Sequence, residues 1–76
     1  MKKFVVIGGQ YSYTVYGFSD TLHGAKCLAT RNTEYWDNWQ GFNRPAIYLT
    51  SQVADGIYHP VYAYNKYMRK WEKTEY

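Results

Sequence analysis

Hydrophobic and polar residues alternate near the start of this 76-residue chain, as they do on β-strands. The alternation covers residues 10 to 17, and residues 3 to 7, before Gly8-Gly9, are β-branched or aromatic apart from Lys3. Two adjacent glycines accept the positive backbone angles of a tight turn, so the pattern predicts a β-hairpin. With that turn, five side chains share the face expected to be the core: Phe4, Val6, Tyr11, Tyr13 and Val15.

A helical pattern follows the hairpin. Ser19-Asp20-Thr21 offers three residues that can cap a helix N-terminus, and Asn32 tolerates the left-handed conformation in which many helices end. The pattern predicts a helix from Thr21 to Arg31. Its apolar stripe consists of small and medium-sized residues, namely Leu22, Ala25, Leu28 and Ala29. Such a narrow stripe suits a helix that lies close against a sheet.

The segment from Asn32 to Pro45 follows neither periodicity and is rich in aromatic residues, with Trp36 and Trp39 among Asp, Asn and Gly residues. In one interpretation the rings fold back and cover one end of the core. In the other, the segment is a recognition loop whose tryptophans insert into a partner, because Trp is enriched at the energetic centres of interfaces. The sequence leaves both interpretations open.

Alternation resumes from Ala46 to Val53, and Ala54-Asp55-Gly56 predicts a turn into a further strand from Ile57 to Tyr64. Val61 and Ala63 are expected to point inward on that strand. Three tyrosines are expected to point outward: Tyr58, Tyr62 and Tyr64.

The last residues admit two structures. Asn65-Lys66 can form a hairpin turn into a strand around Met68 to Thr74, whereas Tyr64, Tyr67, Met68 and Trp71 also lie at helical spacing. We favour the strand. The whole pattern predicts one α+β domain over residues 1–76, in β-β-α-β-β-(β) order, with a mostly antiparallel sheet and one helix packed on one face.

Composition points to binding. The chain has ten tyrosines, three tryptophans and three phenylalanines. A tyrosine combines flat apolar area with one hydroxyl and few torsions to freeze, so a Tyr-rich surface suits contact better than catalysis. The net charge of +3 allows a nucleic-acid partner without requiring one. We therefore expect a non-catalytic binding protein, not an enzyme.

Cellular context follows from two features. A single cysteine, Cys27, rules out an internal disulfide framework, which a small secreted domain usually has. The apolar run Phe4-Val5-Val6-Ile7 is too short for a signal peptide or a membrane span. We expect a protein of a bacterial cytoplasm with no membrane partner.

Candidate chemistry is sparse. Asp20, His23 and Cys27 lie three and four residues apart, so a helix would place these metal-ligand types on one side, but a zinc site needs further ligands. Cys27 lies in mid-helix with His23 one turn away, a pairing too common to indicate an activated thiol. Gly8-Gly9 lacks the spacing of a phosphate loop. We expect no metal, no cofactor and no catalytic residue.

The order of elements resembles that of small α+β proteins of bacteriophages and mobile elements, which include some anti-CRISPR inhibitors. The segments that carry the resemblance are the strand pair, the helix from Thr21 to Ala29, and a hairpin with Tyr62-Ala63-Tyr64 and Lys70-Trp71. The resemblance implies a protein that occupies a surface on host machinery, such as a CRISPR–Cas complex, and inhibits it sterically. It assigns no site residue.

The surplus of aromatic residues over what one helix can cover supplies the candidate contacts with a host protein or ribonucleoprotein. The aromatic candidates are Trp36, Trp39, Tyr48, Tyr62, Tyr64 and Trp71, and the neighbouring cations Lys70 and Arg69 complete the set. Two alternatives remain. A sheet face carrying Tyr48, Tyr58, Tyr62 and Tyr64 beside Lys66, Arg69, Lys70 and Lys73 would suit single-stranded nucleic acid. A contiguous aromatic patch would equally suit a homodimer.

Overall fold

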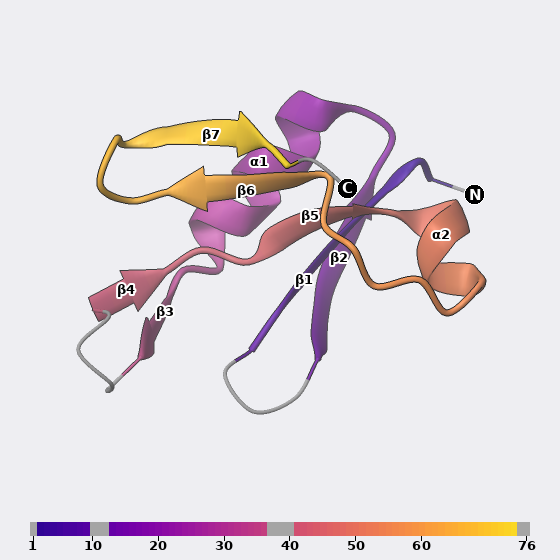
Figure 1. The fold of residues 1–76 in the computed structure, drawn as a ribbon, viewed down its shortest axis with the longest axis horizontal. Helices are drawn as coiled ribbons and strands as arrows, with labels where there is room; N and C mark the ends of the chain where they lie inside the picture. The colour runs from indigo at the N-terminus through magenta and orange to yellow at the C-terminus, as the bar shows by residue number, and fades with distance from the viewer. Residues whose placement is uncertain (1, 10–12, 37–40, 75–76) are drawn as a thin grey trace.

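The fold is known from a computed structural model, which describes residues 2–9, 13–36 and 41–74 (Figure 1). Seven strands and two helices lie in this part of the chain. In chain order they are β1 (Phe4–Gly8), β2 (Thr14–Ser19), α1 (Leu22–Arg31), β3 (Glu34–Trp36), β4 (Gly41–Asn43), β5 (Ala46–Leu49), α2 (Thr50–Ala54), β6 (Tyr62–Asn65) and β7 (Lys70–Lys73).

Five strands form one sheet in the order β2-β1-β5-β6-β7, and all of its neighbouring strands are antiparallel. The α+β class and the predicted order of elements are confirmed. Three elements are additional to the predicted ones. Strands β3 and β4 pair into a separate two-stranded sheet that projects from the body of the molecule (Figure 1), and the short helix α2 follows β5 directly.

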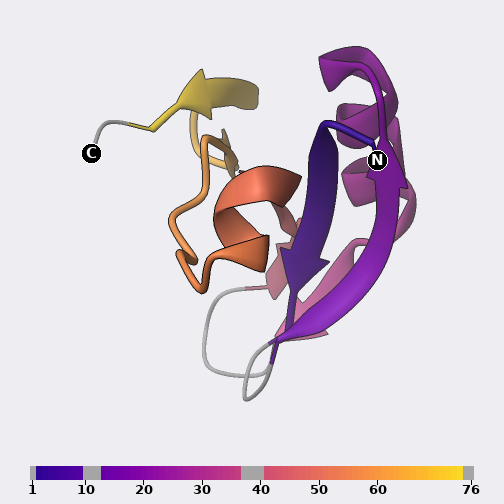
Figure 2. The ribbon, with the colours of Figure 1, turned by 90° about the vertical axis from the view of Figure 1, so that its right-hand side faces the viewer.

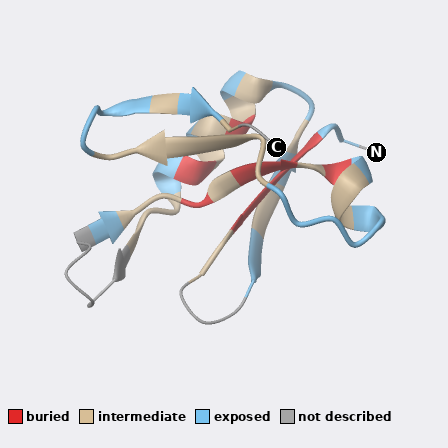
Figure 3. Cartoon of the chain, viewed as in Figure 1, coloured by how far each residue is buried: buried red, intermediate tan, exposed pale blue. Residues whose placement is uncertain are grey.

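The core lies on both faces of strand β1, which is fully flanked by β2 and β5 (Figure 3). Side chains alternate across a strand, so Phe4 and Val6 face α1 while Val5 and Ile7 face the other way. On the first face, the buried partners are Ala25, Ala29 and Ile47. On the second face, Val5 and Ile7 pack with Tyr48 of β5 and Val53 of α2.

Helix α1 begins and ends almost where the sequence predicts. Of the three candidate caps, Thr21 is the one used, and its Oγ1 accepts a hydrogen bond from the Gly24 backbone N–H at 3.0 Å. Asn32 ends the helix, but not in the left-handed conformation, because its φ is −106°. Instead, the Asn32 side-chain amide donates to the Leu28 carbonyl at 2.8 Å. The predicted stripe is confirmed, with Ala25 and Ala29 fully buried.

The first hairpin exists, but its predicted facing is wrong for β2. Gly8 pairs with Thr14 and Ile7 with Val15, so the loop is longer than Gly8-Gly9, and the register shifts between Val6 and Ile7. Val15 consequently lies on the Ile7 side of the sheet and is 53% exposed. An added loop residue or a bulge exchanges the faces of one strand relative to the other. Tyr11 lies outside the described residues.

The region from Ala46 to Tyr64 is less extended than predicted. Strand β5 ends at Leu49, because Thr50 begins α2 and its backbone N–H donates to the Lys3 carbonyl at 3.0 Å. The next strand begins only at Tyr62, after a connection that contains Pro60. The final strand β7 is confirmed, and the helical alternative for these residues is wrong. No helix among the described residues is long and apolar enough to cross a membrane.

Candidate interaction surface

The β6–β7 hairpin places three of the candidate contact residues on one surface. Tyr64 pairs directly with Trp71, and their rings meet edge to face with centroids 5.5 Å apart. Tyr62 points to the same side as Tyr64 because it lies two residues earlier on the strand. Tyr62 and Trp71 also pack against the core cluster beneath α1. This hairpin face is therefore turned toward α1.

Asn65 fixes the turn of this hairpin. Its side-chain oxygen accepts from the backbone N–H groups of Tyr67 and Met68, at 3.0 and 3.1 Å, and its amide donates to the Glu72 carboxylate at 2.8 Å. Arg69 completes the turn with a φ of 56°. The turn leaves Tyr67 86% exposed at the tip. The hairpin thus holds a defined conformation while presenting an aromatic ring at its tip.

Two cations lie over the tyrosine rings of this surface. The Arg44 guanidinium carbon is 3.7 Å from the Tyr64 centroid, and Lys26 Nζ of α1 is 5.8 Å from the Tyr62 centroid. A cation over an aromatic face is attracted by the ring quadrupole, by about 0.5–1 kcal/mol at exposed sites. The tyrosines are therefore already engaged within the molecule, and the cations are held beside the rings.

A shallow groove continues this surface between α1 and β7. It has a volume of about 470 Å³ and is mainly apolar. Its lining residues are His23, Lys26, Cys27, Thr30, Arg31 and Trp71. The charged members of this lining are Lys26 and Arg31, and no carboxylate is among them. We call the groove, together with Tyr62, Tyr64 and Arg44, the aromatic–cationic surface.

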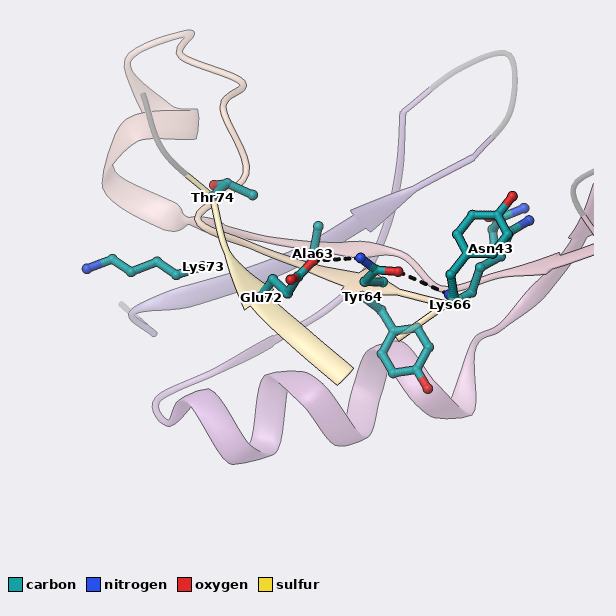
Figure 4. A pocket seen from close by; sticks show the side chains of 9 residues that line it. Asn43, Ala63, Tyr64, Lys66, Glu72, Lys73 and Thr74 are labelled. Atoms are coloured by element: carbon teal, nitrogen blue, oxygen red, sulfur yellow. Dashed lines mark hydrogen bonds between the residues drawn. The ribbon is translucent and has the colours of Figure 1, made fainter. Parts of the chain in front are cut away.

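A second hollow, of about 450 Å³, borders the same hairpin and reaches Asn43 of β4 (Figure 4). In Figure 4 the Tyr64 ring extends toward α1, whereas Ala63 and Glu72 lie on the other side of the hairpin. The one carboxylate in the lining of this hollow, that of Glu72, already accepts a hydrogen bond from the Asn65 amide. Because its polar groups stabilise the turn, this hollow is a weaker candidate for a ligand than the aromatic–cationic surface.

The other candidate contacts are dispersed. Tyr48 lies on the opposite face of the sheet and is only 8% exposed. Arg69 is in the hairpin turn, and Lys70 pairs with Asn65, which places it one residue from Trp71 and on the other face of β7. Trp36 belongs to the small β3–β4 sheet, where its side chain is outside the described part, and Trp39 lies wholly outside the described residues. Neither interpretation of the tryptophan segment is therefore tested.

The expected tyrosine platform on a single sheet face is wrong. Ile47 of β5 pairs with Tyr62 of β6, and residues directly opposite each other share a face, so Tyr62 and Tyr64 lie on the α1 side with Ile47. Tyr48 lies on the other face, beside α2. Tyr58 precedes β6 and stacks on Tyr13, with centroids 4.9 Å apart. The four rings therefore form no continuous surface for successive bases.

Of the residues considered for metal binding or thiol chemistry, Cys27 and His23 lie close together. Cys27 Sγ and His23 Nε2 are 3.6 Å apart on the exposed side of α1. Across the described residues, no three His, Cys, Asp or Glu side chains are grouped to hold a metal ion. Asp20 precedes the cap residue Thr21 and is exposed.

Sequence reasoning missed the cations of the surface. Lys26 follows Ala25 of the apolar stripe, so the sequence already placed it at the border of the helix face that packs on the sheet. Arg44 carries no local signal, because its contact with Tyr64 joins residues twenty positions apart that only the folded chain brings together.

In comparisons with protein-family models, curated proteins and solved structures, nothing matches this chain.

Proposed function

We propose that this chain is a non-catalytic binding protein whose aromatic–cationic surface docks on an acidic surface of a partner protein. One observation carries the proposal: Lys26, Arg31 and Arg44 lie on one surface beside Tyr62, Tyr64 and Trp71. Aromatic residues and arginine are the types enriched in the core of protein interfaces. Cations held over rings complement carboxylates on a partner and speed encounter.

A protein partner is favoured over single-stranded nucleic acid by the state of the rings. A stacking platform needs free ring faces, one for each base. Arg44 covers one face of Tyr64, Trp71 meets that ring edge to face, and Lys26 lies over Tyr62. The order of elements, which resembles that of phage and mobile-element proteins, supports a finer version of the proposal. In that version the partner belongs to host machinery in a bacterial cytoplasm, and docking inhibits it sterically.

The test is capture from bacterial lysate by the tagged full chain, with and without nuclease, read by mass spectrometry. Three charge reversals are compared with the wild type: Lys26→Glu, Arg44→Glu and, as a matched control, Lys2→Glu at an exposed position before β1. A nuclease-resistant partner that is lost with the first two variants and retained by the control supports the proposal. Recovery that disappears with nuclease, or an equal loss with Lys2→Glu, contradicts it. Thermal unfolding of each variant confirms that the fold is retained.

A further inference from the structure

We propose that the chain forms a symmetric dimer in which β2 of one copy pairs antiparallel with β2 of a second copy. The five-stranded sheets of the two copies then become one continuous sheet across the two-fold axis. This inference is independent of the proposed function, because β2 and the β6–β7 hairpin lie at opposite ends of the strand order.

The outer edge of β2 offers unpaired backbone groups. Strand β2 is the first strand of the sheet and pairs with β1, and no other described strand lies along its outer side. Figure 2 shows β2, in violet, at one margin of the molecule. On either side of its bulge, β2 is an extended strand, and its N–H and C=O groups that point away from β1 can pair with another extended strand.

The side chains of β2 identify the kind of strand that fits. The strand reads Thr-Val-Tyr-Gly-Phe-Ser from Thr14 to Ser19 and contains no charged residue and no proline. Natural edge strands are usually protected by such residues, Lys in particular. Val15 and Phe18 are 53% and 49% exposed. A strand with no charge and with exposed apolar side chains pairs best with a strand of the same kind. Strand β2 of a second copy is such a strand.

The other edge of the sheet does not meet this requirement. Strand β7 reads Lys-Trp-Glu-Lys, so three of its four residues are charged. Pairing of β2 with β7 of another copy would set Val15 or Phe18 beside those charges. It would also be head-to-tail, and contacts of that kind close into rings or continue into filaments. Pairing of β2 with β2 closes after two copies.

A specific register follows from the bulge in β2. Val15 pairs with Ile7 and Phe18 with Val5, so both side chains lie on the α2 side of the sheet. Gly17 pairs with Val6, and Tyr16 packs against the cluster on the α1 side. When Val15 faces Phe18 of the second copy, Tyr16 faces Gly17, and every pair has its side chains on matching sides. The two-fold axis then passes between Tyr16 and Gly17.

Sedimentation equilibrium of the full chain over a range of concentrations tests the dimer. The expected result is an apparent mass that rises from 9.0 kDa toward twice that value. Phe18→Glu and Val15→Lys should each weaken association at least tenfold, since each buries a charge against an apolar side chain. Phe42→Glu is the matched control, because Phe42 is 65% exposed on β4, away from this edge. A wild-type mass of 9.0 kDa at every concentration, or equal weakening by the control, overturns the proposal.

The double variant Val15→Lys with Phe18→Glu tests the register. In the proposed pairing, the introduced ammonium of each copy faces the introduced carboxylate of the other, so association should recover relative to both single variants. A double variant that is folded by circular dichroism but associates no better than the single variants overturns the register. Lys26→Glu should leave the dimer mass unchanged, so failure of the dimer and failure of the docking surface are told apart.

Discussion

The two edge strands of the five-stranded sheet, β2 and β7, differ in how their side chains protect them from pairing with a further strand. Both present backbone groups that no neighbouring described strand pairs. Strand β7 carries charge at three of four positions, and its one ring, Trp71, is turned toward α1 and Tyr64. Strand β2 carries no charge and leaves Val15 and Phe18 exposed. The difference indicates that charged side chains protect β7 against strand pairing, whereas β2 has no charged side chain that could do so.

The two edges also differ in how they are attached. Strand β2 pairs with β1 through five registered pairs, and α1 lies close on it, since a Cβ at Gly17 would be 3.2 Å from a methyl of Leu28. Strand β7 is attached to the sheet through β6, and β6 pairs with β5 through the single pair Ile47 and Tyr62. The hairpin that carries the aromatic–cationic surface therefore depends on side-chain packing more than on backbone pairing.

The largest expected effect comes from removing the residue that joins the two halves. Ile47 is fully buried and pairs with both Val6 and Tyr62. Ile47→Ala should lower the free energy of unfolding by about 2–5 kcal/mol, through lost transfer energy and the cavity that remains. Chemical denaturation measures this change. Ile57→Ala removes the same atoms at an exposed position, and a loss as large as that of Ile47→Ala would contradict the central role of Ile47.

A smaller and local effect is expected at Trp71. The ring is half-buried, so Trp71→Ala should cost about 2 kcal/mol, less than the full truncation of a buried aromatic side chain. Because β6 has little backbone attachment, amide hydrogen exchange should accelerate in β6 and β7 while β1 and β2 keep their protection. Tyr67→Ala, at the exposed tip of the same hairpin, should change neither quantity. Uniform acceleration across all strands would show that the hairpin does not open separately.

The smallest effect is expected at the start of α1, the helix that covers the β1–β2 side. Thr21→Ala removes the oxygen that accepts from the Gly24 N–H and should cost about 1 kcal/mol of unfolding free energy. Thr21→Ser keeps that acceptor and should lose little. Thermal unfolding of the pair decides the point, and equal losses in both variants would assign the effect to the methyl group instead of the cap.

Local signals accounted for the elements that were predicted correctly. The cap at Thr21 and the stripe of Leu22, Ala25 and Leu28 are contained within eight residues, so the sequence predicted α1 nearly to the residue. The final hairpin also followed from alternation and a turn residue, Asn65. The small β3–β4 sheet and α2 were missed, because each is short and neither shows a full period of its pattern.

For the candidate site, the sequence supplied the residues but not their arrangement. It nominated Tyr62, Tyr64 and Trp71, which the structure brings together, and it grouped them with Tyr48, which lies on the other face. Their role in binding stays a prediction. Lys26 and Arg44, which give the surface its charge, entered only with the folded chain.

The sequence by itself determined the α+β class, the order of the predicted elements, the limits of α1 and an aromatic content suited to binding, because these depend on neighbouring residues or on composition. The tertiary structure decided which way the tyrosines face, which strands are edges and which cations meet which rings. These depend on register, and register is set by a bulge near Val6 and by one pairing of Ile47 with Tyr62. A shift of one residue at either place turns a whole strand over, and no local pattern records that shift.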